Sequence, residues 1–225
     1  AVGSGDRSFT AIANQVGGPG PLPSGTLSPL LSLLVTKRAL AIDRPLSTKP
    51  DRKNNRYHIA DPYLRFWLSF LQRAIPLVER GHGEEALDRI ERAWPAWRGR
   101  AVEPLVRESL TRLLPDPGWP QTEAVGGWWN RQNNPEIDLV GTDREPVAGA
   151  VHFVGSVKWL ENQPFGRRDY VALIRDMLAV PGAGADTPVV AVSRSGVADG
   201  VPLAARWGPE ELVDAWRSPS PAGRG

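Results

Sequence analysis

The sequence contains no cysteine and only three histidines, His58, His82 and His152, among its 225 residues. Without cysteine the chain can form no disulfide, offers no thiol nucleophile and has no thiolate ligands for zinc. The three histidines are scattered and do not form a metal-ligand spacing. Any metal ion bound by this chain would therefore be held by oxygen ligands.

Long apolar runs are also missing. No segment approaches the ~20 apolar residues that a membrane helix needs, and the N-terminus lacks the pattern of a secretory signal. We therefore expect a soluble, cytoplasmic chain without a membrane partner. Its hydrophobic content of 41% is sufficient for a substantial core. Because the chain begins at Ala1 and its only methionine is Met177, we expect it to be part of a longer protein.

Acidic residues are scarce in the first third of the chain. Residues 1–73 hold ten lysines and arginines against four aspartates and glutamates, although the net charge of the whole chain is only +2. The candidate DNA-binding residues in this part are Lys37, Arg38, Lys49, Arg52, Lys53 and Arg56. Such a basic cluster attracts polyanions, and double-stranded DNA is the expected partner. A solvated loop with no ligand is the alternative.

The order of elements in residues 1–60 favours DNA binding over a solvated loop. Apolar residues at helical spacing predict helices over 9–16 and 24–37, and short β-like runs at 39–45 and 55–61 flank the basic loop. Two helices followed by a basic hairpin are typical of a winged helix, whose second helix enters a DNA groove. We predict that residues 1–60 form a winged helix that lacks its first helix.

Four segments together resemble a known family. They read RYHIADPYLRFWLSFLQRAIP, GRAVEPLVRESL, GGWWNRQNNPEIDLVG and GSVKW, and they begin at Arg56, Gly99, Gly126 and Gly155. The first is similar to the segment after the winged helix in the archaeal-type P-loop ATPases, and the others are similar to the C-terminal domain of unknown function in that family. The resemblance implies an upstream ATPase domain as a partner. No G-x-x-x-x-G-K-[ST] motif occurs here, so we expect no ATP binding by this chain itself.

The resemblance also implies a PD-(D/E)xK restriction-endonuclease-like fold for the second half. We predict an α/β (α+β) chain with a mixed sheet flanked by helices. In this prediction residues 61–98 form a helical connector that ends at a break marked by Pro95 and Gly99, and Asp61 and Pro62 begin its first helix. Residues 99–217 form the nuclease-like domain, and residues 218–225 form a disordered tail.

The two strands predicted around PEIDLV and VHFVGSVKW carry the candidate site. An antiparallel hairpin would place Asp138 beside Ser156 and Lys158, and strict alternation would place Ile137 and Leu139 on the face opposite Asp138. A nuclease of this type needs carboxylates for Mg²⁺ and a lysine near the scissile phosphate. The candidate catalytic residues are Asp138, Lys158, Glu103 and Ser156, with Asp138 and Glu103 as the metal ligands.

Ser156 occupies the position where the family pattern has a carboxylate. A neutral hydroxyl is a weaker ligand for Mg²⁺ than a carboxylate. The leading hypothesis is a DNA-binding, nuclease-like portion of an archaeal-type ATPase that is catalytically weak or inactive, with Lys158 paired to Asp138. The alternatives are an active Mg²⁺-dependent DNA endonuclease and a protein-interaction module that regulates the ATPase.

Tryptophan is abundant, with nine residues, and two of them are adjacent. Trp128 and Trp129 could stack on nucleic-acid bases. Adjacent strand residues face opposite sides of a sheet, however, and this pattern favours packing of both rings inside the protein.

Overall fold

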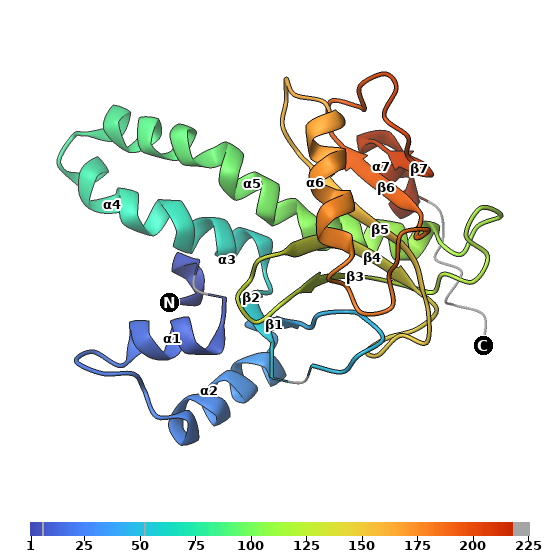
Figure 1. Ribbon diagram of the computed structural model, residues 1–225. Helices are drawn as coiled ribbons and strands as arrows, with labels where there is room; N and C mark the ends of the chain where they lie inside the picture. Colours follow the sequence, from blue (N-terminus) through green and yellow to red (C-terminus); the bar gives the residue numbers. More distant parts are fainter. Residues whose placement is uncertain (6, 52, 218–225) are drawn as a thin grey trace. The chain divides into compact units, whose positions relative to one another are not determined.

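The computed structural model describes residues 1–5, 7–51 and 53–217, which form two compact units (Figure 1). Unit 1 comprises Ala1–Arg44 and Arg52–Trp94, and unit 2 comprises Pro45–Asp51 and Pro95–Gly225. The predicted α/β class is confirmed, because helices accompany a five-stranded mixed sheet. Among the described residues, the helices are all too short or too polar to cross a membrane. The predicted tail, 218–225, lies outside the described residues.

Unit 1 begins with two helices and a two-stranded antiparallel sheet. Ser8 caps the first long helix by accepting a hydrogen bond from the Ala11 N–H at 3.2 Å. In the sheet, Leu40 pairs with Ile59. Buried apolar side chains of both helices and both strands form one core. The elements are a 3-10 helix η1 (Val2–Ser4), α1 (Phe9–Val16), α2 (Ser24–Thr36), β1 (Leu40–Asp43) and β2 (Arg56–Ile59).

A continuous helical segment follows, and it begins as the sequence predicts. The Asp61 carboxylate accepts a hydrogen bond from the Leu64 N–H at 2.6 Å, and Pro62 is the first helical residue. The Phe66 ring lies 5.4 Å from the ring of Phe70, four residues further along the same helical segment. The parts of the segment are α3 (Pro62–Phe66), a π-helix η2 (Trp67–Leu71) and α4 (Gln72–Glu79).

The next helix, α5 (Gly83–Leu113), runs without interruption through Pro95 and Gly99. The predicted break at these two residues is wrong. Proline removes one helical hydrogen bond, but side-chain packing on both sides of Pro95 supports the helix. Before the proline, Trp94 packs edge-on against Phe66, with ring centroids 5.9 Å apart. After it, Leu110 is completely buried in unit 2.

Unit 2 is built on a mixed sheet with strand order β3-β4-β5-β6-β7. The first three strands are antiparallel, and β6 and β7 add in parallel. The elements are β3 (Ala124–Trp129), β4 (Glu136–Thr142), β5 (Val151–Lys158), α6 (Arg167–Met177), β6 (Val189–Ser193), β7 (Ala205–Trp207) and α7 (Pro209–Arg217). The two strands that the sequence predicts around PEIDLV and VHFVGSVKW correspond to β4 and β5.

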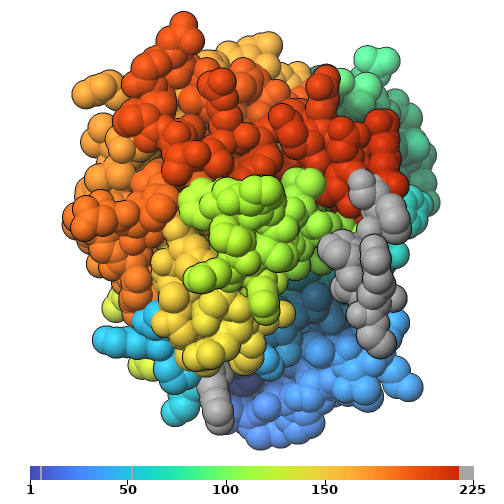
Figure 2. Space-filling view, turned by 90° about the vertical axis from the view of Figure 1, so that its right-hand side faces the viewer, coloured from blue at the N-terminus to red at the C-terminus, as the bar shows by residue number. Residues whose placement is uncertain are grey.

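Helices cover both faces of the sheet. One core cluster contains Leu173 and Met177 of α6, and the other contains Leu110 of α5 and Leu212 of α7. Helix α7 also contacts α5 directly, because the indole N–H of Trp216 donates to Ser109 Oγ at 2.8 Å. In Figure 2 the red surface of the C-terminal helix accordingly borders the green surface near the end of α5.

Strand β4 contains an irregularity at the candidate site. Gly126 pairs with Val140 and Trp128 pairs with Ile137, so β4 advances by three residues where β3 advances by two. Ile137 and Val140 consequently share one core cluster, whereas Leu139 belongs to the other. The predicted placement of Ile137 with Leu139 is therefore wrong. An extra residue of this kind, a β-bulge, changes the direction of neighbouring side chains, and Asp138 is one of the residues at this position.

The adjacent tryptophans are packing residues. Trp128 is 7% exposed and Trp129 is 2% exposed, which leaves neither ring accessible for stacking on a base. The interpretation of these two residues as core side chains is confirmed.

The centre of the loop between β1 and β2 belongs to unit 2. The Leu46 N–H donates to the Gly127 carbonyl at 2.8 Å, and the Thr48 N–H donates to the Pro181 carbonyl at 3.1 Å. Leu46 is almost fully buried. The sequence predicts a solvent-facing basic loop, but burial of this leucine and pairing of the backbone hold residues 45–51 within unit 2.

Candidate metal centre

Three carboxylates converge between α5 and the start of β4. Glu103 projects from α5, while Glu136 and Asp138 come from β4, and one oxygen of each lies within 4.8 Å of the other two. The structure thus brings Glu103 and Asp138 together, as the sequence predicts. Glu136 is an addition, because no ligand role was predicted for it. Its position two residues before Asp138 in PEIDLV was the available signal.

Asp138 is held by donors from the neighbouring strand. Its Oδ2 accepts hydrogen bonds from Ser156 Oγ and from the Val157 N–H, both at 2.8 Å. Burial raises the pKa of Asp138 above its ordinary value, and it outweighs these two hydrogen bonds and the nearby charge of Arg107, which act in the opposite direction. The predicted proximity of Asp138 and Ser156 is therefore present, with Ser156 acting as a donor.

Arg107 lies beside the carboxylates. Its Nη2 is 3.3 Å from Glu103 Oε2, and its Nε donates to the backbone carbonyl of Asp138 at 2.9 Å. A Cβ atom at Gly127 would lie 2.6 Å from Arg107 Nη2, so the glycine leaves the room that the guanidinium occupies. Arg107 therefore joins α5 to the sheet and offsets one negative charge of the cluster.

Lys158 does not pair with Asp138 in the described residues. Its Nζ donates to Asp169 Oδ1 at 2.8 Å, and Asp169 Oδ2 accepts from the Gly166 N–H at 3.0 Å. Burial alone would raise the pKa of Asp169, but the bonds from Lys158 and Gly166 together lower it. The prediction of an ion pair between Lys158 and Asp138 is wrong, because α6 places the carboxylate of Asp169 at the lysine. Asp169 was missed because nothing in the sequence fixes how α6 approaches β5.

The candidate DNA-binding residues are divided by exposure. Lys37, Arg38, Lys49 and Lys53 are exposed. Arg56 is only 5% exposed, because it lies in β2 opposite Asp43, and this burial excludes direct contact with a phosphate backbone in this conformation. Arg52 lies outside the described residues.

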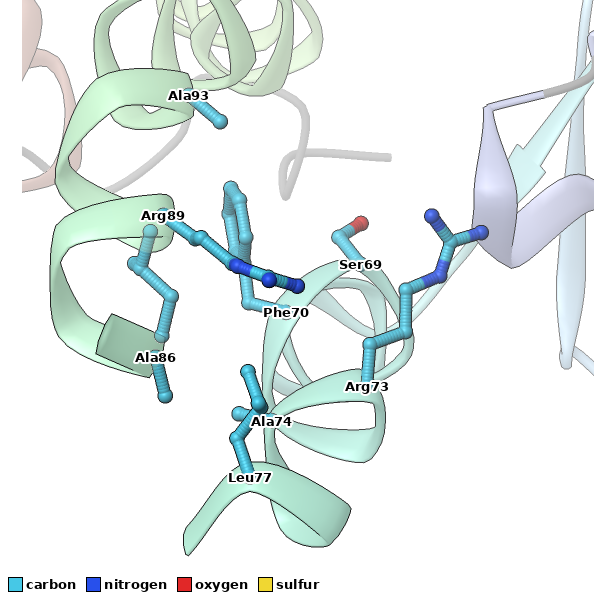
Figure 3. Close-up of a pocket in the computed structure, with 9 residues that line it drawn as sticks. Ser69, Phe70, Arg73, Ala74, Leu77, Ala86, Arg89 and Ala93 are labelled. Atoms are coloured by element: carbon cyan, nitrogen blue, oxygen red, sulfur yellow. The ribbon is translucent and has the colours of Figure 1, made fainter. Parts of the chain in front are cut away.

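A cavity of about 280 Å³ lies within unit 1 between the η2–α4 segment and α5. Its lining includes Phe70, Leu77 and two arginines, Arg73 and Arg89. Figure 3 shows Arg89 extending toward Phe70, whereas Arg73 points away from both of these residues. Arg89 also forms an ion pair with Glu85 at 2.5 Å. The lining contains no carboxylate or histidine, so this cavity lacks the groups for acid–base or metal chemistry.

Comparisons with known proteins agree on the part of the chain that holds the site. A family described as archaeal and bacterial proteins of unknown function, DUF234, matches residues 67–168. This range includes Glu103, Glu136, Asp138 and Lys158 and ends one residue before Asp169.

An uncharacterized protein of Methanocaldococcus jannaschii is 24% identical over 179 residues, which cover 79% of this chain and 37% of that protein. The chain thus spans little more than a third of the length of this relative. No solved structure gives a significant match. The chain is similar to DUF234 proteins in its central part, and the archaeal relative is itself uncharacterised.

Proposed function

We propose that this chain is a DNA-binding, nuclease-like portion of a longer archaeal-type ATPase and that Glu103, Glu136 and Asp138 hold a divalent cation. The observation that carries the proposal is the convergence of three carboxylate oxygens within 4.8 Å. The motifs shared with the ATPase family support the nuclease-like part of the proposal, and the greater length of the archaeal relative is compatible with a further domain.

The donor set fits a hard divalent cation. Mg²⁺ and Mn²⁺ prefer carboxylate oxygens, and affinity increases with the number of negative charges. Glu136 supplies a carboxylate that Ser156 does not. Two features weaken the fit: Arg107 offsets the charge of Glu103, and Asp138 Oδ2 already accepts two hydrogen bonds. We therefore infer weak binding of Mg²⁺ by Glu103, Glu136 and Asp138.

The same arrangement favours little or no cleavage of DNA. A bound Mg²⁺ would supply a Lewis acid for a phosphodiester oxygen and an activated water. Lys158 would then have to stabilise charge at the phosphate, but its ammonium group is engaged by Asp169 at 2.8 Å. Ser156 offers a hydroxyl that donates to Asp138, and it provides no anionic ligand. We therefore propose a catalytically weak or inactive site.

Contact with DNA is proposed for the exposed basic side chains of unit 1. Lys37 and Arg38 follow α2, the second helix of the proposed winged helix, and Lys53 precedes β2. The short sheet of β1 and β2 supports this assignment, since its hairpin corresponds to the wing. Arg56 takes no part in the proposed contact because it is buried.

A second candidate function is a protein-interaction module. Helix α2 carries no charged residue, and its outward side exposes Leu30, Leu33 and Leu34 by 49%, 53% and 41%. An exposed apolar surface of this kind is more typical of a protein interface than of a helix that reads DNA. This observation favours a protein partner for α2 itself.

A paired assay on the 225-residue chain distinguishes the candidates. Electrophoretic mobility shift of duplex DNA and nicking of plasmid DNA are measured with EDTA, Mg²⁺ or Mn²⁺. The proposal predicts a shift with little or no nicking. Metal-dependent nicking that Asp138→Ala abolishes would establish the endonuclease instead, whereas the absence of both a shift and nicking would favour the interaction module.

A further inference from the structure

We propose that a second cavity in unit 2, at the carboxyl ends of β6 and β7, binds a nucleobase, with guanine preferred. This inference rests on the proposed function, because it names a nucleic-acid group that the domain would recognise. The cavity has a volume of about 310 Å³, and its lining includes Ser193, Val197, Arg206, Trp207 and Glu211. The carboxyl ends of parallel strands are a common position for ligand sites in α/β folds.

Ser193 provides the first argument for a ligand. The residue is 1% exposed, and its Oγ is buried without a hydrogen-bond partner among the described residues. A buried hydroxyl without a partner costs free energy, and such groups are uncommon unless a ligand, ion or water completes them. Ser193 lines the cavity, so a molecule bound there is in a position to supply the missing partner.

The charged groups of the lining define the chemistry of the ligand. Arg206 is exposed and makes no ion pair within the described part of the chain, so its guanidinium is available as a donor. Glu211 accepts the Gly208 N–H through Oε2 at 2.9 Å, which leaves Oε1 as an acceptor. One positive and one negative side chain balance each other. A neutral ligand with both donors and acceptors therefore fits better than a bare phosphate.

Guanine has the matching edge. Arginine donates to guanine O6 and N7 in the commonest specific base contact, and the N1–H and N2–H₂ groups of guanine are donors for a carboxylate such as Glu211. Trp207 is partly exposed in the lining, and aromatic side chains stack on unpaired bases. Contact of Glu211 with N1–H and N2–H₂ would require an unpaired or extruded base, because these groups are occupied by base pairing in a duplex.

Strand pairing also relates the cavity to Lys158 of the candidate catalytic residues. Ser193 pairs with Lys158 in the parallel register of β5 and β6. A nucleotide whose base occupied the cavity would therefore lie one strand away from Lys158.

Isothermal titration of the 225-residue chain with GMP, AMP, CMP, UMP and inorganic phosphate tests the proposal. GMP is expected to bind at least about tenfold more tightly than inorganic phosphate and more tightly than the other nucleotides. Arg206→Ala and Glu211→Gln should each weaken GMP binding by about tenfold, as for loss of a charge-assisted hydrogen bond. Glu210→Gln is the matched control, because Glu210 precedes Glu211 in α7 but does not line the cavity. The affinity of this variant for GMP should equal that of the wild type.

Ser193→Ala separates a ligand contact from a structural role. In the free protein the hydroxyl has no partner to lose, so the melting temperature should stay constant or rise while GMP affinity falls by about threefold to tenfold. Absence of GMP binding, equal binding of GMP and phosphate, or a lower melting temperature with unchanged affinity would each overturn the base site.

A mobility-shift assay with duplex DNA, run on the same variants, tests the proposed function separately. A duplex shift without GMP binding would retain the proposed function and reject the cavity as a base site. GMP binding without any duplex shift would support the base site and reject duplex DNA as the partner.

Discussion

At the scale of single residues, Asp138 links the candidate metal centre to stability. Burial raises the pKa of Asp138 in the folded state above its ordinary value of 3.8. As pH rises past 3.8, the carboxyl group of Asp138 therefore loses its proton in the unfolded chain before it does so in the folded chain. The free energy of unfolding should therefore fall as pH rises, until the folded carboxyl group also ionises.

Asp138→Asn should remove this pH dependence. Asparagine keeps an oxygen that can accept from Ser156 and Val157 but does not titrate. In EDTA we expect the variant to be at least as stable as the wild type at pH 7 and to lose less stability between pH 4 and pH 7. Urea denaturation at several pH values measures the free energy of unfolding. If this free energy depended on pH in the variant as it does in the wild type, ionisation of Asp138 would not lower the stability of the fold.

Arg107 is expected to affect stability and metal binding in opposite directions. Arg107→Met breaks a buried ion pair with Glu103, so the free energy of unfolding should fall by about 3–5 kcal/mol. It also removes a positive charge from the carboxylate cluster, so Mn²⁺ affinity should rise. Denaturation and Mn²⁺ titration of the same variant check both effects.

Arg89→Met is the control for this prediction, because Arg89 forms an exposed ion pair with Glu85 in the same helix. Its effect on stability should stay below about 1 kcal/mol, with no change in Mn²⁺ affinity. A destabilised Arg107→Met variant that binds Mn²⁺ no better than the wild type would mean that the arginine does not oppose the cation.

At the scale of secondary-structure elements, local patterns predict the two strands that carry part of the site. The segments PEIDLV and VHFVGSVKW correspond to β4 and β5, and antiparallel pairing brings Asp138 to Ser156. Glu103 follows from the family resemblance. These features depend on residues that are close in sequence or on a repeated motif.

The remaining features depend on contacts between distant segments. The irregularity of β4 depends on its register with β3, and strict alternation cannot reveal that register. The partner of Lys158 depends on where α6 places Asp169. The burial of Leu46 depends on the backbone of Gly127. A single sequence contains no local signal for any of these three contacts.

The unbroken α5 gives a prediction at the same scale. Pro95 lies inside the helix and removes one backbone hydrogen bond. Pro95→Ala should restore that bond and raise the free energy of unfolding by about 1–3 kcal/mol. The control is Pro62→Ala in the first turn of α3, where a proline loses no helical bond and its replacement should give no gain. A lower melting temperature for Pro95→Ala would imply that the proline shapes α5 in a way the fold requires.

At the scale of the whole molecule, the proposed DNA contacts are made by exposed basic residues of unit 1 and by Lys49 of the loop between β1 and β2. DNA binding through Lys37, Arg38, Lys49 and Lys53 should weaken steeply with salt, because neutralised phosphates release counterions. Replacing these four residues with alanine should reduce the slope of log K against log salt by about 0.9 for each phosphate that the protein no longer neutralises. Fluorescence anisotropy at several salt concentrations measures the slope.

Arg175→Ala is the control for the salt dependence, because Arg175 is an exposed arginine in α6 of unit 2. Its replacement should leave the slope as it is in the wild type. If the fourfold alanine variant also retained the wild-type slope, these four exposed basic residues would not contact DNA.

The most direct test of the proposed metal centre is Mn²⁺ binding by the wild type and by Glu136→Gln, followed by electron paramagnetic resonance. We predict one weak, saturable Mn²⁺ site per chain that Mg²⁺ displaces, that Glu136→Gln abolishes or weakens at least about tenfold, and that Ser156→Glu tightens by adding an anionic oxygen. The proposed metal centre would be contradicted by a wild-type chain that binds no Mn²⁺ or by a Glu136→Gln variant that binds it with wild-type affinity.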